Sequence, residues 1–257
     1  MKKRVTIVLP VFNEKGNLEK MVVSILEKRK KDLHNFFLNI VIADSRSTDG
    51  TRDIARRLSK RFKNVHHIIT GPGLGVGLYE GHKYAIRRTD PDILVQIDAD
   101  GQVVENVIQD LIVAIEEGND LAIGSRFLAG GRNELPMLRK IFSLGSSLFC
   151  RVVMGPADIK EFTNSARAFT PTLFKKINWK RLPWKRKTFI FMPAFINEAV
   201  LAGAKYKEVP LVFRNRDQGD SKNRVARYTW DLIVYCLEAR LLKWGIEISR
   251  LAGFGEQ

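Results

Sequence analysis

Two aspartates and a glutamine, closely spaced, give the clearest chemical signal in the sequence. Asp98, Asp100 and Gln102 directly follow residues 93–97, an apolar run typical of a short buried strand. Carboxylate and amide oxygens are ligands that Mg²⁺ or Mn²⁺ accepts, and such ions often share their coordination with substrate phosphates. A turn in which the carboxylates cap the next helix is the alternative. We interpret the three residues as a metal site.

Polar or glycine-rich segments also follow the other predicted strands. Asn13 and Glu14 follow the first strand, Asp44 the second, and residues 71–77, which contain four glycines, the third. In an open parallel sheet, ligands bind outside the carboxyl ends of the strands. The glycine-rich segment either cradles phosphate or is a plain turn, since it matches neither a P-loop nor G-x-G-x-x-G.

A charged segment near the end of the chain offers cations for a phosphorylated ligand. Arg216 and Lys222, together with Ser221, follow a predicted strand and could clamp a diphosphate, although an ordinary charged loop has the same composition. The four histidines are too scattered for a zinc site. No Cys/His pairing or G-x-S-x-G motif indicates nucleophilic catalysis.

Alternating strands and helices must position these residues. The hydrophobic pattern predicts strands at 5–9, 37–44, 65–69, 93–97 and 121–123, and helices at 18–30, 51–62, 78–88 and 104–117. Such alternation is typical of an α/β fold with a mostly parallel sheet. Beyond Arg126 the rhythm breaks. There we expect a helix up to residue 154, a helix at 191–202, a strand at 206–213 and an amphipathic helix at 223–244.

Composition limits the possible partners. The 257 residues carry a net charge of 43 − 28 = +15, which indicates an anionic partner such as nucleic acid, a phosphorylated ligand or anionic lipid, or else a solvated basic surface. Two cysteines exclude a disulfide scaffold. The uncharged apolar runs are far shorter than the roughly 20 residues of a membrane-spanning helix. The N-terminus reads as a strand rather than a signal peptide.

A stretch of alternating indoles and cations indicates one route to a membrane. Residues 179–187 contain Trp179, Trp184 and five Lys or Arg side chains. Tryptophan favours membrane interfaces and cations favour anionic headgroups. An ordinary surface loop and a base-stacking surface remain alternatives. The helix at 223–244 offers a second route through Trp230, Ile233, Val234, Leu237, Leu241 and Trp244, unless the core buries that stripe.

The order of these motifs resembles the family 2 glycosyltransferases of the GT-A fold, most closely the dolichol-phosphate mannose synthase group. The matching segments run from residue 5 to residue 222. They are VLPVFNE at 8–14, DSRSTDGT at 44–51, GLG at 73–75, DADGQ at 98–102, GSRF at 124–127, and EVP at 208–210 followed by RDQGDSK at 216–222.

The resemblance implies a fold and a set of residue roles. The fold would be α/β, a GT-A, Rossmann-like and mostly parallel central sheet flanked by helices. Residues 1–222 would form the catalytic domain, and residues 223–257 a C-terminal amphipathic helical extension packed on the domain or on the membrane surface. Binding of the base and ribose would fall to Pro10, Phe12, Glu14 and Asp44. Contacts to the nucleotide and a Mg²⁺ or Mn²⁺ ion would come from Asp98, Asp100 and Gln102. The acceptor phosphate would face Arg126 and Arg139, and the donor phosphates Arg216 and Lys222.

The sequence also departs from the family pattern. Ser45 and Arg46 stand where the family has aspartate and glycine, which affects the expected base contacts. The segment 161–167 reads EFTNSAR and lacks the family's glycine and phenylalanine, which affects the expected sugar and acceptor preference.

The implied activity is transfer of a hexose, with inversion, from a GDP-mannose or UDP-glucose type of donor to a polyprenyl or dolichyl phosphate. The catalytic residues would be Asp100, Arg126, Arg139 and Arg216. A phosphate acceptor is already largely ionised near neutral pH and needs little general-base help. The same-fold alternative, a soluble or polysaccharide hydroxyl acceptor, needs a base, and none is obvious. A basic nucleic-acid-binding protein is the alternative from another class, but the carboxylates would repel a phosphate backbone.

The expected partners follow from that activity. They are a nucleotide sugar, a polyprenyl phosphate lipid and an anionic membrane surface, with no nucleic acid. We expect a cytoplasmic protein, peripheral on the cytoplasmic face of a membrane. A small membrane-spanning subunit is the alternative means of attachment.

Overall fold

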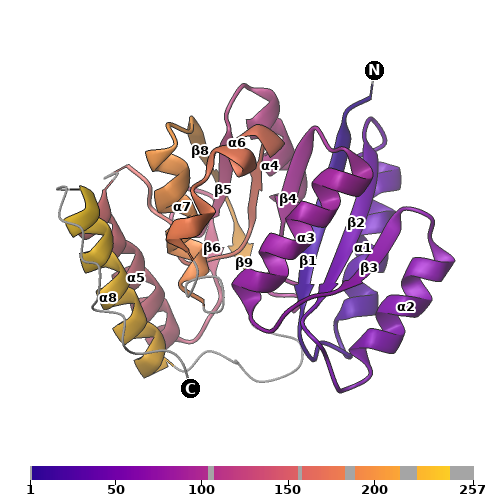
Figure 1. Ribbon diagram of the computed structural model, residues 1–257, viewed down its shortest axis with the longest axis horizontal. Helices are drawn as coiled ribbons and strands as arrows, with labels where there is room; N and C mark the ends of the chain where they lie inside the picture. Colours follow the sequence, from indigo (N-terminus) through magenta and orange to yellow (C-terminus); the bar gives the residue numbers. More distant parts are fainter. Residues whose placement is uncertain (1, 104–106, 156–157, 183–188, 215–224, 244–257) are drawn as a thin grey trace.

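A computed structural model describes residues 2–103, 107–155, 158–182, 189–214 and 225–243. Its centre is a seven-stranded sheet in the order β3-β2-β1-β4-β7-β5-β8 (Figure 1). The strands are β1 (Arg4–Val11), β2 (Phe37–Asp44), β3 (Val65–Ile69), β4 (Ile93–Gln96), β5 (Leu121–Ser125), β7 (Arg167–Phe169) and β8 (Tyr206–Pro210). All neighbours are parallel except β7, which is antiparallel to β4 and β5. The predicted mostly parallel α/β sheet is confirmed.

The register brings the predicted motifs to one edge of the sheet. Val11 at the end of β1 pairs with Asp44 at the end of β2, and Val8 of β1 pairs with Gln96 at the end of β4. The loops that leave these three strands are therefore neighbours at the carboxyl edge, where α/β proteins bind ligands.

Helices cover both faces of the sheet because the strand residues are apolar on both sides. On one face α1 (Leu18–Lys31), α2 (Thr51–Arg61) and α4 (Val107–Glu116) share a buried cluster with alternate residues of β1 such as Ile7. On the other face α3 (Leu74–Thr89), α5 (Met137–Met154), α6 (Pro171–Lys176), α7 (Phe191–Leu201) and α8 (Val225–Lys243) share a second cluster that includes Val8.

The third helix starts earlier than predicted, so part of the glycine-rich segment 71–77 is helical rather than a loop. The expected loop at 71–77 ends at Gly73, and α3 already includes Gly75 and Gly77. A Cβ at Gly77 would lie 2.9 Å from Ser45 Oγ, and a Cβ at Gly81 would lie 2.6 Å from a methyl of Val8. These two glycines let α3 approach the sheet closely.

The second half of the chain contains elements that the periodicity did not predict. The expected strand at 206–213 is interrupted after Pro210, and β9 (Val212–Phe213) pairs instead with β6 (Arg132–Asn133) in a separate two-stranded sheet. The strand β7, the helix α6 and the short 3₁₀ helix η1 (Trp179–Arg181) were also missed. All of these segments have six residues or fewer, too few for a pattern to repeat.

The predicted last helix is present as α8, but the face that packs on the protein is not the predicted apolar stripe. Figure 1 shows α8 beside α5 at one end of the molecule. The buried side of α8 consists of Leu232, Tyr235 and Cys236, and the Sγ atoms of Cys236 and Cys150 of α5 are 3.8 Å apart. Trp230 and Leu237 of the predicted stripe are 67% and 51% exposed, so the core does not bury that stripe. Trp244 lies outside the described residues.

Trp179 does not form part of a free surface loop. Its indole N–H donates to the carbonyl of Phe174 at 2.9 Å, and its ring packs against Tyr79 and Phe174. The ring is therefore partly buried against the core, and its proposed membrane role stays a prediction. Trp184 lies outside the described residues. No helix of the described chain is long and apolar enough to cross a membrane. The division at residue 222 stays a prediction.

Candidate active site

The loops that follow β1 and β2 are joined by hydrogen bonds into one rim. The backbone N–H of Asn13 donates to Ser47 Oγ at 3.0 Å, and the Asn13 side chain accepts from the N–H of Thr48 at 2.9 Å. The N–H of Glu14 donates to Thr51 Oγ1 at 2.8 Å. This places the predicted nucleotide residues Pro10, Phe12, Glu14 and Asp44 in adjacent positions, with the Phe12 ring 46% exposed at the rim.

Asp44 has more partners than the sequence indicated. Its carboxylate is fully buried, and it accepts from the N–H of Ser47 at 2.8 Å and from Arg52 Nε at 3.1 Å. The ring of His67, on β3, lies 3.8 Å away. Burial lowers the pKa of His67, and Asp44 opposes that shift. Asp44 thus stabilises the turn after β2 in addition to its predicted base contact.

The predicted metal residues follow β4 in a tight turn. Asp100 Oδ1 accepts from the backbone N–H of Gln102 at 3.1 Å, and Gly101 adopts a left-handed φ of 76°. The Gln102 amide nitrogen donates to the carbonyl of Arg214 at 3.2 Å, which ties this turn to the end of β9. Asp100 and Gln102 are buried, whereas Asp98 is partly exposed.

This set of oxygen donors fits a hard divalent cation that also binds a ligand. Two carboxylates and one amide oxygen are too few to surround Mg²⁺, so the ion would need ligand phosphates or water to complete its shell. The described residues contain no cluster of three or more His, Cys, Asp or Glu side chains able to hold a metal alone.

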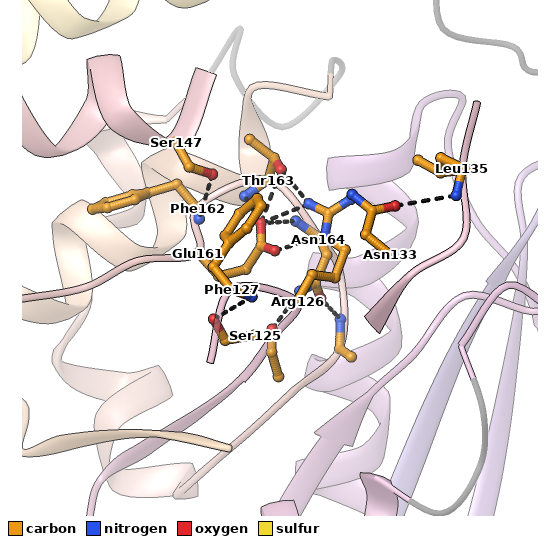
Figure 2. A network of polar contacts seen from close by, with 12 residues as sticks. Ser125, Arg126, Phe127, Asn133, Leu135, Ser147, Glu161, Phe162, Thr163 and Asn164 are labelled. Carbon is orange, nitrogen blue, oxygen red and sulfur yellow. Dashed lines mark hydrogen bonds and ion pairs between the residues drawn. The ribbon is translucent and has the colours of Figure 1, made fainter. Parts of the chain in front are cut away.

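Arg126 lies directly after β5 and is held by a buried carboxylate. Arg126 Nε and Nη2 donate to the two oxygens of Glu161, each at 2.7 Å, and Nη2 also donates to Thr163 Oγ1 at 2.7 Å (Figure 2). The ring of Phe213 lies 4.9 Å from the guanidinium carbon. Such a bidentate charged pair fixes the plane of the guanidinium.

A cavity of about 180 Å³ joins the metal turn to the helices α5 and α8. It brings together three predicted site residues, namely Gln102, Arg126 and Arg139 of α5. The remaining lining is apolar or carries hydroxyl groups: Leu135, Phe142, Ser143, Ser146, Thr163, Phe189, Phe213, Tyr228 and Thr229.

The described lining of this cavity contains no Asp, Glu or His. Its one phenol, Tyr228, has a pKa raised by burial, so it remains protonated at neutral pH. The cavity can therefore neutralise and orient an anion, but its lining offers no side chain suited to removing a proton.

Some predicted residues are not placed in this site. Arg216 and Lys222 lie outside the described residues, and their roles stay predictions. Sequence reasoning also missed Glu161, Thr163 and the hydroxyl groups of α5 and α8. The only signal for Glu161 was an acid at the start of the segment 161–167.

Comparison with known proteins identifies the family. The model of glycosyl transferase family 2 matches residues 6–202, and the chain belongs to that family. The chain is 30% identical over 256 residues to a dolichol-phosphate mannosyltransferase of Pyrococcus furiosus, covering 98% of this chain and 67% of that protein. It is 29% identical to a polyprenol monophosphomannose synthase of Mycolicibacterium smegmatis, over 86% of this chain and 81% of that protein.

A solved structure agrees with the fold. Glucosyl-3-phosphoglycerate synthase of Mycobacterium tuberculosis, in complex with Mn²⁺, UDP and phosphoglyceric acid, superposes with a TM-score of 0.61 at 20% identity, covering 96% of this chain and 80% of that one. The fold is that of the GT-A glycosyltransferases. The chain is accordingly a glycosyltransferase, an enzyme that transfers a hexose.

Proposed function

We propose that this enzyme transfers a hexose from a nucleoside diphosphate sugar to the phosphate of a polyprenyl lipid. The observation that carries the proposal is the cavity beside the metal turn, which has two arginines, four aliphatic hydroxyl groups and no described carboxylate or imidazole. The names of the relatives at about 30% identity support the same acceptor. Mannose is the sugar that these names favour.

The chemistry of this cavity suits a phosphate better than a hydroxyl acceptor. A phosphate monoester has a second pKa near 6 and is already a nucleophile at neutral pH. A hydroxyl acceptor must lose its proton during attack and needs a nearby base. Arg126 and Arg139 would hold the acceptor phosphate close to the donor diphosphate, two anions that would otherwise repel each other.

On the donor side, residues at the carboxyl ends of the strands would bind the nucleotide. Pro10, Phe12, Glu14 and Asp44 would contact the base and ribose, while Asp98, Asp100 and Gln102 would hold a divalent cation. When bound, that cation neutralises charge on the departing nucleoside diphosphate. Arg216 and Lys222 would add positive charge at the same phosphates.

The acceptor would reach the cavity from a membrane whose surface contacts helix α5. Five large side chains of α5 recur at helical spacing and are 50–72% exposed: Met137, Ile141, Leu144, Leu148 and Val152. Buried residues of this helix lie on its opposite side. The cations Arg139, Lys140 and Arg151 are on the same helix, which contains no acid. An exposed apolar stripe with positive flanks fits the interface of an anionic bilayer.

Helix α8 extends this apolar surface. Trp230 and Leu237 are exposed on α8, which packs beside α5. Phe142 and Phe189, both partly exposed, line the cavity and could carry the isoprenoid chain from the phosphate toward the lipid. Direct docking of this kind is our proposal, and attachment through a small membrane-spanning subunit is the alternative.

A donor screen tests the proposed activity. The purified protein would be incubated with each common sugar nucleotide, Mn²⁺ or Mg²⁺, and a polyprenyl phosphate in detergent, and the lipid fraction would be analysed by mass spectrometry. We expect one hexosyl phospholipid, formed most rapidly from GDP-mannose, with release of nucleoside diphosphate. Absence of a hexosyl phospholipid with every donor would contradict the proposal.

A further inference from the structure

Glu161 is a fully buried carboxylate to which the mechanism above gives no task. Its two oxygens receive Nε–H and Nη2–H of Arg126 in parallel, the strongest arrangement for this kind of pair (Figure 2). Burial raises the pKa of this carboxyl, but the charge and hydrogen bonds of Arg126, with those of Thr163, outweigh burial and bring the pKa below its ordinary value. Glu161 is therefore ionised in the folded protein.

A second layer of contacts fixes Glu161 to the sheet. Glu208 of β8 accepts the backbone N–H groups of Lys160 and Glu161, at 3.0 and 2.8 Å. The N–H and hydroxyl of Thr163 both donate to Glu161 Oε1 at 2.9 Å. Glu208 therefore holds the backbone at Glu161, and Thr163 holds the Glu161 carboxylate. These contacts keep the carboxylate in place independently of Arg126.

This arrangement leaves one end of the Arg126 guanidinium available. Glu161 and Thr163 take the protons of Nε and Nη2. The rings of Phe127 and Phe213 lie 5.5 and 4.9 Å from the guanidinium carbon. Within the described residues, Nη1 has no hydrogen-bond partner, and Arg126 lines the cavity. Two N–H groups thus remain to bind an anion.

We propose that Glu161 is a positioning residue that directs Nη1 of Arg126 toward the acceptor phosphate. This inference rests on the proposed function, because it assigns that phosphate to the cavity. Arg126 and Glu161 together carry no net charge, so Arg126 acts as an oriented hydrogen-bond donor. Arg139, which is exposed on α5, supplies a positive charge that no ion pair among the described residues offsets.

Replacing Glu161 separates positioning from simple neutralisation. If Glu161 only reduces the positive charge of the cavity, Glu161→Gln adds one unit of charge and tightens anion binding. If Glu161 positions Arg126, the same variant releases the guanidinium and weakens binding. Glu161→Asp provides a second comparison, because it keeps the charge but shortens the side chain by one methylene.

The first measurement is the KM for farnesyl phosphate, a short isoprenyl phosphate, beside the calorimetric affinity for GDP and UDP. For Glu161→Gln and Glu161→Asp we expect the KM to rise about 10-fold or more, the size expected for losing a charged hydrogen bond. Nucleotide affinity should stay at the wild-type value. The surface variant Glu117→Gln, which loses an ion pair with Lys207, is the matched control and should change neither quantity.

Tighter farnesyl phosphate binding in Glu161→Gln, or an equal loss of nucleotide affinity in both Glu161 variants, would overturn the proposal. If neither variant folds, Thr163→Val decides, because it removes a single hydroxyl from the network. We then expect a rise in KM of about threefold to tenfold at unchanged nucleotide affinity. An unchanged KM in that variant would count against positioning.

A second measurement does not depend on transfer. In protein labelled with ¹⁵N-arginine, the Arg126 Nε–H signal is assigned by its absence from Arg126→Lys. We expect a slowly exchanging proton that shifts on titration with inorganic phosphate, and an affinity at least about 10-fold weaker in Glu161→Asp. Equal phosphate affinities would overturn the positioning role. If wild-type protein transfers no sugar to farnesyl phosphate or longer lipids, the proposed function fails, while this titration still tests Glu161.

Discussion

The two halves of the chain build their parts of the site by different means. In residues 2–103, long strands and helices alternate, and the functional residues stand immediately after the strands. In residues 107–243, Arg126 also follows a strand, but other residues of the candidate site lie on an exposed helix, on a segment without regular structure at 158–166, and on α8. The first half resembles many nucleotide-binding sheets, whereas the second half shapes most of the cavity that we propose binds the acceptor.

This difference shows where the specificity of such an enzyme resides. Backbone geometry at the strand ends determines where a nucleotide can bind, and much of that geometry is common to the fold. In our proposal, acceptor choice depends instead on side chains from distant segments, such as Arg126, Glu161 and Thr229, which meet only after folding. Substitutions in the two halves should accordingly affect different steps.

The largest effect should come from the metal turn of the first half. Asp100→Asn removes a charge but keeps the oxygen that accepts from Gln102, so the fold should be preserved. We expect turnover to fall by at least about 100-fold, because the leaving diphosphate loses its counterion. Steady-state transfer in Mn²⁺ checks this, with Asp110→Asn, an exposed aspartate of α4, as control. Full activity of Asp100→Asn, or of wild type in excess chelator, would refute the metal role.

A smaller and more selective effect is expected at Arg139. Removing this cation from the cavity should raise the KM for a polyprenyl phosphate about 10- to 100-fold, because a charge-assisted contact is lost. Nucleotide affinity, measured by calorimetry, should not change. Lys175→Ala is the control, since this exposed lysine of α6 lies outside the cavity lining and outside the proposed membrane surface. An equal loss of nucleotide affinity in Arg139→Ala would transfer Arg139 to the donor side.

The apolar surface gives a comparison between two similarly exposed residues, one on each side of the sheet. Leu148→Glu on α5 places a charge in the proposed membrane contact, whereas Val113→Glu on α4 alters an apolar side chain of the opposite face. Co-sedimentation with anionic vesicles at low salt should weaken about 10-fold for Leu148→Glu, from lost apolar burial. Binding by Val113→Glu should match wild type. If wild type does not bind these vesicles, direct docking is wrong and a membrane-spanning partner is required.

The smallest effect is a pH dependence of the free energy of unfolding, caused by His82 at the point where α3 packs against the second half of the chain. Burial lowers the pKa of His82 to about 3, and its ring packs 4.9 Å from that of Phe169. Below pH 6.5 the unfolded chain gains a proton that the folded chain rejects, so stability falls as the pH drops. From pH 7 to pH 5 the loss should be about 2 kcal/mol.

Denaturant unfolding at several pH values measures this loss. His82→Gln should flatten most of the slope, and His34→Gln, at an exposed histidine, should keep it. The partly buried histidines His66 and His67, whose pKa values burial also lowers, account for the remaining slope. A wild-type slope that persists in His82→Gln would show that this ring takes up a proton in the folded state.

The sequence predicted the first half well because its signals are local. The apolar runs before Asp44 and Asp98 predict two strands, and the aspartates mark the carboxyl end of each. The second half depends on contacts between distant residues, such as Arg126 with Glu161, and no local pattern encodes them. Trp179 shows the same limit, since an indole among cations looks like a surface residue until Tyr79 and Phe174 are found against it.

Hydrophobic spacing likewise cannot tell which face of a helix is covered. The stripe predicted on α8 could have faced either a membrane or the core, and the protein buries Leu232 and Tyr235 and exposes Trp230. On α5, no sequence pattern separates the exposed Leu148 from the buried Cys150. Both outcomes follow from how α5 and α8 pack together, which is a tertiary property.

The central claim is that the cavity between the metal turn and α5 accepts a phosphate carried on an isoprenoid chain. The most direct test is competition among acceptors at one fixed donor: a polyprenyl phosphate, the matching polyprenol, and 3-phosphoglycerate. The account predicts that sugar is transferred to the polyprenyl phosphate alone, and that Arg139→Ala transfers it more slowly than the wild type. Transfer to 3-phosphoglycerate or to the polyprenol at a comparable rate would contradict it.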